Sequence, residues 1–137
     1  MKVFLDTNIV IDFLAKREDF FQDASVIFEM LNRKMFEGII SSLTIVNCAY
    51  ILKKAYSKEI MTEKIKWLIK SFTISRIDES VIKKAVRLNP NDFEDAVQYA
   101  SAVSANSDVI ISRDEKGFID FKDILIMNPS VFLDKCK

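Results

Sequence analysis

Short apolar runs alternate with longer amphipathic segments along this chain. Runs rich in β-branched and aromatic residues predict strands at residues 3–5, 38–41, 72–76, 109–112 and 124–126. Between them, apolar residues recur every three or four positions, which predicts helices near residues 8–16, 20–33, 44–55, 58–71, 79–88 and 91–105. Asn128-Pro129 starts a last helical turn.

Strands that alternate with helices predict the α/β class, with a parallel sheet covered by helices on both faces. A length of 137 residues fits one domain with a substantial core, spanning residues 1–137. The segment at residues 44–55 is apolar almost all round, so we expect that helix to be deeply buried.

Four polar residues stand at comparable places beside the predicted strands. Asp6 follows the first strand, and Asp114 follows the fourth. Asn47 lies early in the helix after the second strand, and Asp95 lies early in the helix before the fourth. Each has a structural alternative, because such residues also cap helices, open turns or bond to nearby backbone.

Together, the four residues indicate a ligand site more specifically than any one of them does. In a doubly wound sheet of order 3-2-1-4-5, the first and fourth strands are neighbours at the switch point, where this fold class binds ligands. Asp6 and Asp114 would then lie side by side, and a raised pKa or a bound cation must relieve their repulsion. Oxygen ligands without His or Cys favour Mg²⁺ or Mn²⁺.

Composition excludes several kinds of site. The chain has no histidine, which removes Ser-His-Asp and Cys-His catalytic sites and most zinc sites. With two glycines, it has no phosphate-binding loop. Lys+Arg and Asp+Glu are 20 each, so the net charge is zero and a general nucleic-acid-coating protein, which would usually be basic, is disfavoured. An enzyme that contacts nucleic acid at one local patch is still compatible with this charge.

Cysteine usage and hydropathy bear on the cellular compartment. Cys48 and Cys136 form neither a disulfide framework nor a zinc motif, which fits a reducing cytoplasm. No apolar run reaches the ~18 residues that a membrane span needs. The sequence therefore predicts a cytoplasmic protein without a membrane anchor.

Three stretches carry a family resemblance. Leu5-Asp6-Thr7-Asn8, Phe93-Glu94-Asp95-Ala96 and Ile111-Ser112-Arg113-Asp114 resemble motifs of PIN-domain nucleases, and most closely those of VapC-like toxins. The resemblance covers essentially the whole chain. It implies a three-layer α/β/α fold, a parallel sheet of about five strands in the order 3-2-1-4-5, and acids that bind Mg²⁺ or Mn²⁺.

The resemblance also implies a role for each matching residue. Asp6, Asp95 and Asp114 would bind the metal, and Asn47 would complete the catalytic set. Many PIN nucleases have glutamate at the position of Asn47, and an uncharged amide should hold a metal less tightly. Further residues would orient these ligands, namely Thr7, Asn8, Ser112 and Glu94.

Basic residues would hold the RNA phosphates. The candidates are Arg17, Lys53, Arg113 and Lys116, but for all of them except Arg113 an ordinary solvated charge is the favoured interpretation. Arg113 is the strongest of them, because it adjoins Asp114. Asp12 follows Asn8 by one helical turn and could add a water-mediated contact to the site, but we expect it to be an exposed helix acid.

The leading hypothesis is a metal-dependent endoribonuclease that hydrolyses RNA phosphodiester bonds as the toxin of a toxin–antitoxin pair. The resemblance implies a small antitoxin and a homodimer as partners. A second hypothesis is a PIN-fold RNA- or protein-binding module with weakened catalysis, motivated by Asn47. A metal-dependent phosphatase is disfavoured, because Asp6-Thr7-Asn8 lacks the second acid that an aspartyl-phosphate phosphatase needs.

Overall fold

The central sheet is parallel throughout. A computed structural model describes residues 1–118 and 121–136, and within these residues five strands pair in the order β3-β2-β1-β4-β5. The strands are β1 (Lys2–Leu5), β2 (Glu37–Ser41), β3 (Thr73–Ser75), β4 (Val109–Ile111) and β5 (Leu125–Met127). The predicted fold class and strand order are confirmed.

The two central strands are apolar because both faces of the sheet are covered. In β1, Val3 and Leu5 pack into one core cluster and Phe4 packs into the other. In β4, Val109 and Ile111 share the first cluster, while Ile110 joins the second. Successive side chains of a strand point to opposite faces, so a continuous apolar run supplies both cores.

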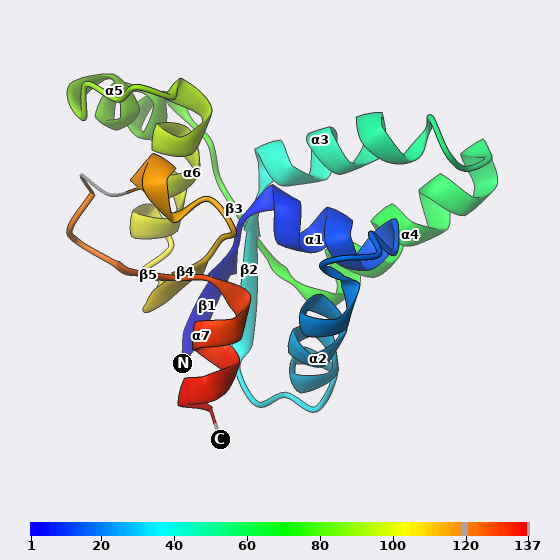
Figure 1. The fold of residues 1–137 in the computed structure, drawn as a ribbon. Helices are drawn as coiled ribbons and strands as arrows, with labels where there is room; N and C mark the ends of the chain where they lie inside the picture. The colour runs from blue at the N-terminus through cyan, green and yellow to red at the C-terminus, as the bar shows by residue number, and fades with distance from the viewer. Residues whose placement is uncertain (119–120, 137) are drawn as a thin grey trace.

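Helices form the two outer layers (Figure 1). One face carries α1 (Thr7–Leu14), α2 (Phe21–Asn32), α3 (Ser42–Leu52), α4 (Lys58–Ser71) and α7 (Pro129–Lys135), and the other carries α5 (Glu79–Arg87) and α6 (Phe93–Ser104). A short 3₁₀ helix, η1 (Glu115–Phe118), follows β4. Because β1 and β4 are parallel neighbours, the polar residues that follow them lie at the same edge of the sheet.

Helix α3 is less buried than its sequence predicts. Thr44, Cys48 and Leu52 are buried at four-residue intervals, but Val46 and Tyr50 are 65% and 55% exposed. One face of the helix packs against the rest of the protein, and the opposite face meets solvent although it is apolar. The expectation of a deeply buried helix was wrong for that face, because periodicity cannot show which apolar faces find a partner.

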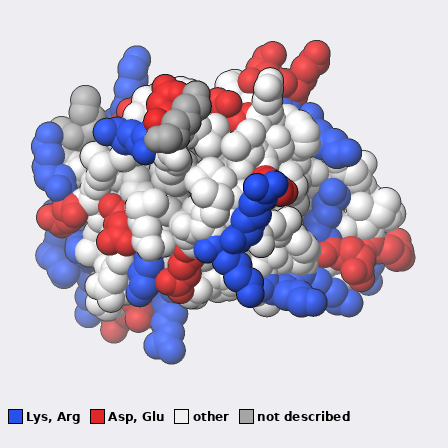
Figure 2. Space-filling model, turned by 90° about the horizontal axis from the view of Figure 1, so that it is seen from below, with Lys and Arg blue, Asp and Glu red and all other residues white. Residues whose placement is uncertain are grey.

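Charges are mixed over the underside of the molecule. Figure 2 views the protein from below, from the end of the sheet where β1 begins, and Lys and Arg alternate there with Asp and Glu. This distribution agrees with the zero net charge. No helix in the described part of the chain is long and apolar enough to cross a membrane.

Candidate active site

Asp6 joins the two central strands at their carboxyl ends. Its backbone N–H donates to the carbonyl of Ile111 over 3.0 Å. The Thr7 N–H donates to Asp6 Oδ1 over 2.8 Å, and Ser112 Oγ donates to Asp6 Oδ2 over 2.7 Å. Asp6 therefore caps α1 and is held in place by the residue that follows β4.

Asp95 and Asp114 converge near Gly117. Asp95 lies in the first turn of α6, and Asp114 accepts a hydrogen bond from the Gly117 N–H over 3.2 Å. A Cβ atom at Gly117 would overlap Asp95 Oδ2 and would lie 2.9 Å from Asp114 Oδ2. Glycine at this position thus lets the chain of η1 pass close to both carboxylates.

The acids at this edge repel one another. Burial raises the pKa of Asp95 to about 7, and the charges of Asp92, Asp6, Asp114 and Glu94 add to the rise. Burial also raises the pKa of Asp6, against hydrogen bonds that lower it, and the charge of Asp114 contributes to the rise. Within the described residues, no lysine or arginine is within ion-pair distance of Asp6, Asp95 or Asp114.

A cation fits this arrangement by charge and by ligand chemistry. The site offers carboxylate oxygens and no nitrogen or sulfur ligand, as Mg²⁺ and Mn²⁺ prefer. An ion would also relieve the repulsion that raises these pKa values. As placed here, no three acidic or cysteine side chains among the described residues enclose an ion, so binding would require the carboxylates to close around it.

Asn47 reaches the acids through Glu94. Its Nδ2 donates to Glu94 Oε1 over 3.2 Å, across the gap between α3 and α6. Burial is the largest cause of the raised pKa of Glu94, followed by the charges of Asp6 and Asp92. Asn47 therefore lies beside the cluster but adds no charge to it.

The predicted orienting residues differ in their positions. Ser112 bonds to Asp6 through its hydroxyl, and Thr7 does so through its backbone N–H. Asn8 is exposed, and its side chain makes no hydrogen bond to these acids within the described residues. Sequence reasoning missed Gln98, Ser41 and Thr44, which form a buried polar network under Asp6. The available signal was a glutamine among the buried apolar residues of α6.

The prediction that Asp12 is exposed was wrong. Its side chain is 1% exposed and accepts two hydrogen bonds from Arg113, over 2.7 and 3.1 Å. Arg17 lies 3.7 Å from the same carboxylate, and the Arg113 guanidinium stacks 3.7 Å from the centre of the Phe20 ring. Arg113, which follows β4, and Arg17, from the α1–α2 connection, therefore both contact the Asp12 carboxylate of α1.

The candidate RNA contacts therefore fall into two groups. Arg17 and Arg113 are already paired with Asp12. Lys53 and Lys116 are exposed, and Lys53 lies over the Tyr50 ring at 4.7 Å. An RNA-binding role for any of the four remains a prediction.

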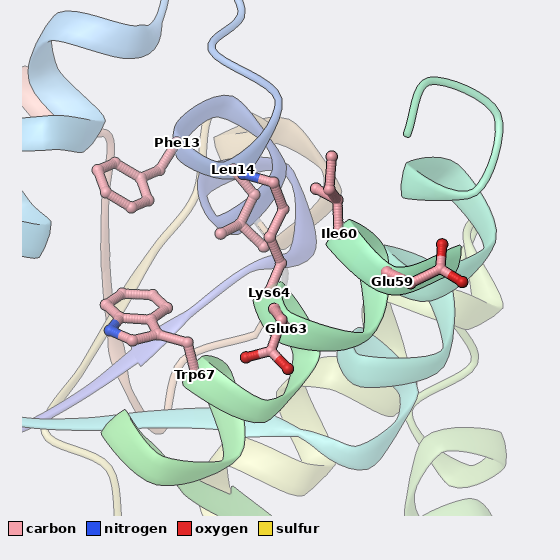
Figure 3. Close-up of a pocket in the computed structure, with 7 residues that line it drawn as sticks. All are labelled: Phe13, Leu14, Glu59, Ile60, Glu63, Lys64 and Trp67. Carbon is pink, nitrogen blue, oxygen red and sulfur yellow. The ribbon is translucent and has the colours of Figure 1, made fainter. Parts of the chain in front are cut away.

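An apolar groove lies between α1 and α4 (Figure 3). Its volume is about 470 Å³. Phe13, Leu14, Ile60 and Trp67 supply its apolar wall, and Glu59, Glu63 and Lys64 also line it. None of Asp6, Asp95 and Asp114 lines this α1–α4 groove.

Comparison with known proteins gives a family and a set of similar structures. A sequence model of the PIN domain matches residues 2–116. The search of curated proteins found no match.

Several solved structures share the fold. The Rickettsia felis VapBC2 structure, bound to a DNA fragment from the promoter, is 18% identical, with a TM-score of 0.72 over 93% of this chain and 98% of that one. A toxin–antitoxin complex from Klebsiella pneumoniae is 21% identical, with a TM-score of 0.70 over 93% and 97%. Mycobacterium tuberculosis VapC20, a toxin that cleaves the sarcin-ricin loop, is 10% identical, with a TM-score of 0.64 over 79% and 86%.

Proposed function

The chain belongs to the PIN-domain family, and from that premise we propose that it is a metal-dependent endoribonuclease and the toxin of a toxin–antitoxin pair. One observation carries the proposal. Asp6, Asp95 and Asp114 converge at the carboxyl edge of the sheet with no basic partner among the described residues. Structural packing alone gives no reason to gather acids in this way.

In the proposed reaction, the chain's own residues hold and orient the reacting groups. Asp6, Asp95 and Asp114 would hold Mg²⁺ or Mn²⁺, which when bound makes water a stronger nucleophile and offsets charge on a phosphodiester. Ser112 keeps the Asp6 carboxylate oriented. Asn47 would fix Glu94 beside the cluster. The exposed Lys116 of η1 would attract RNA phosphates.

The proposed partners are RNA as substrate, a small antitoxin and a second copy of this chain. The Rickettsia and Klebsiella structures support an antitoxin, because both are described as toxin–antitoxin or VapBC assemblies. The α1–α4 groove offers an apolar surface that an apolar segment of such an antitoxin would fill.

The test is cleavage of a labelled total RNA pool with Mn²⁺, with Mg²⁺ and with chelator. Asp6→Asn is the decisive variant, because asparagine caps α1 as well as aspartate does but removes the charge. Asp19→Asn is the matched control, since Asp19 is an exposed acid in the α1–α2 connection. We expect metal-dependent cleavage by the wild type and the control, and none by Asp6→Asn. Cleavage by Asp6→Asn at the wild-type rate would refute the proposal.

The second candidate is a PIN-fold RNA- or protein-binding module with weakened catalysis. The neutral Asn47 beside Glu94 favours it, because this position adds no ligand charge. A wild-type protein that binds RNA in a gel-shift assay but cuts nothing with either metal would support this candidate. Cleavage that appears in Asn47→Glu alone would identify the lost charge as the cause.

A further inference from the structure

A fully buried amide lies beneath the acidic edge. Gln98 in α6 is 0% exposed. Its Nε2 lies 2.9 Å from Thr44 Oγ1, 3.0 Å from Thr7 Oγ1 and 3.5 Å from Asp6 Oδ1. On its other side, Ser41 Oγ donates to Gln98 Oε1 over 2.5 Å. The amide is thus bonded at both ends, as a buried polar group must be.

The hydrogen bonds fix which way the amide points. Asp6 Oδ1 is an acceptor, so the amide nitrogen must face it, because an oxygen there would meet a carboxylate oxygen. The two amide protons have three acceptors within reach, and the hydroxyls of Thr7 and Thr44 are the nearer ones. These hydroxyls also bond to each other over 2.8 Å. Gln98 therefore acts on Asp6 chiefly through Thr7, the residue that follows it.

The network ties together the elements that carry the acids. Ser41 ends β2, Thr7 begins α1, and Thr44 lies in the first turn of α3. Gln98 lies one turn after Asp95 in α6. Its bonds therefore set how far the first turn of α6, with Asp95, lies from Asp6. An apolar side chain would fill the space but leave this separation to packing alone.

We propose that Gln98 is a positioning residue that holds Asp6 and Asp95 at the separation needed to share one divalent cation. The inference rests on the proposed metal-dependent function. Gln98 touches neither the cation nor the RNA in this scheme. Groups that orient metal ligands in this way typically change metal affinity or activity by about 10–100-fold when they are mutated.

The test compares Gln98→Met with Ser101→Ala. Methionine is of similar length and removes both ends of the amide. Ser101 is equally buried in α6, but it bonds to Ser75 and to the Arg76 carbonyl, away from the acids. Mn²⁺ affinity is measured by electron paramagnetic resonance, and urea unfolding checks that each variant is folded. We expect Gln98→Met to bind Mn²⁺ at least ~10-fold more weakly and Ser101→Ala to bind it as the wild type does.

Cleavage kinetics add a second readout. We expect Gln98→Met to lower kcat while KM for RNA stays close to the wild-type value, because Gln98 makes no contact with substrate in this scheme. If Gln98→Met does not fold, Thr44→Val replaces it, because valine keeps the shape of threonine and removes the hydroxyl that Gln98 bonds. Thr44→Val should also weaken Mn²⁺ binding while leaving KM unchanged.

The outcomes separate this inference from the proposed function. Wild-type Mn²⁺ affinity in a folded Gln98→Met or Thr44→Val protein would overturn the positioning role, although the wild type still cleaves RNA. An equal loss of affinity in Ser101→Ala would also overturn it, since general loosening of α6 would then be the cause. A wild type that neither binds Mn²⁺ nor cleaves RNA would refute the proposed function and this inference together.

Discussion

Replacing Arg113 with methionine should destabilise the protein by about 2–4 kcal/mol. Asp12 is 1% exposed and takes both of its short hydrogen bonds from Arg113, at 2.7 and 3.1 Å. Without Arg113, the remaining cation is Arg17, which lies 3.7 Å from the carboxylate. A buried carboxylate that loses its partner cannot regain water without local opening of the structure.

The magnitude follows from the geometry of the pair. Breaking a buried ion pair by removing one partner costs about 3–5 kcal/mol. Arg17 compensates part of this loss, and the Arg113 side chain is 25% exposed, so we expect the loss of the ion pair to cost less than this range, about 1.5–3 kcal/mol. Loss of the stacking on Phe20 adds about 0.5–1 kcal/mol.

Urea unfolding followed by circular dichroism measures this loss, with Lys116→Met as control. Lys116 is an exposed cation in the same connection, so its loss should cost less than about 0.5 kcal/mol. In a double-mutant cycle, Asp12→Leu should remove most of the penalty of Arg113→Met, because the buried charge goes with it. A loss below about 1 kcal/mol in Arg113→Met, with no coupling to Asp12, would refute the reasoning. Unchanged stability with weaker RNA binding would instead assign Arg113 to the substrate.

Two further predictions concern the acids. Gly117→Ala should weaken Mn²⁺ binding at least ~10-fold without removing a ligand, because the new Cβ would displace the carboxylates of Asp95 and Asp114. Mn²⁺ affinity is measured by calorimetric titration, with Gly38→Ala as the control. The Cβ of that variant would meet apolar side chains, so it should lower stability without changing Mn²⁺ affinity. Equal Mn²⁺ affinity in the two variants would contradict the prediction. The second prediction concerns pH. The pKa of Asp95 is about 7 in the folded protein, against 3.8 for an ordinary aspartate, so between these pH values the folded state binds more protons than the unfolded state. The free energy of unfolding without metal should therefore fall as pH rises from about 4 to 7, and Asp95→Asn should remove this part of the slope in urea titrations; identical slopes in both proteins would show that Asp95 is not responsible.

Local pattern was sufficient for most of the architecture. The apolar runs predicted the strands, with the fifth displaced by one residue, and the helical spacing predicted the helices. These features could be read because burial on both faces requires continuous apolar strands, and burial on one face requires a 3.6-residue repeat. The approach of Asp6 to Asp114 could also be inferred, since the strand order makes β1 and β4 neighbours.

The surroundings of the acids depended on contacts between residues far apart in the chain. Asp12 and Arg113 are separated by 101 positions, and Gln98 and Thr7 by 91. Asp12 stands among apolar residues, but nothing near it in the sequence shows that Arg113 pairs with it, and nothing near Gly117 shows that two carboxylates approach it. By itself, the sequence determined the elements, their order and the edge where the acids gather, because these follow from local periodicity and chain direction. Only the tertiary structure decided which polar groups lose water and which partners they find, because that depends on how whole faces pack together.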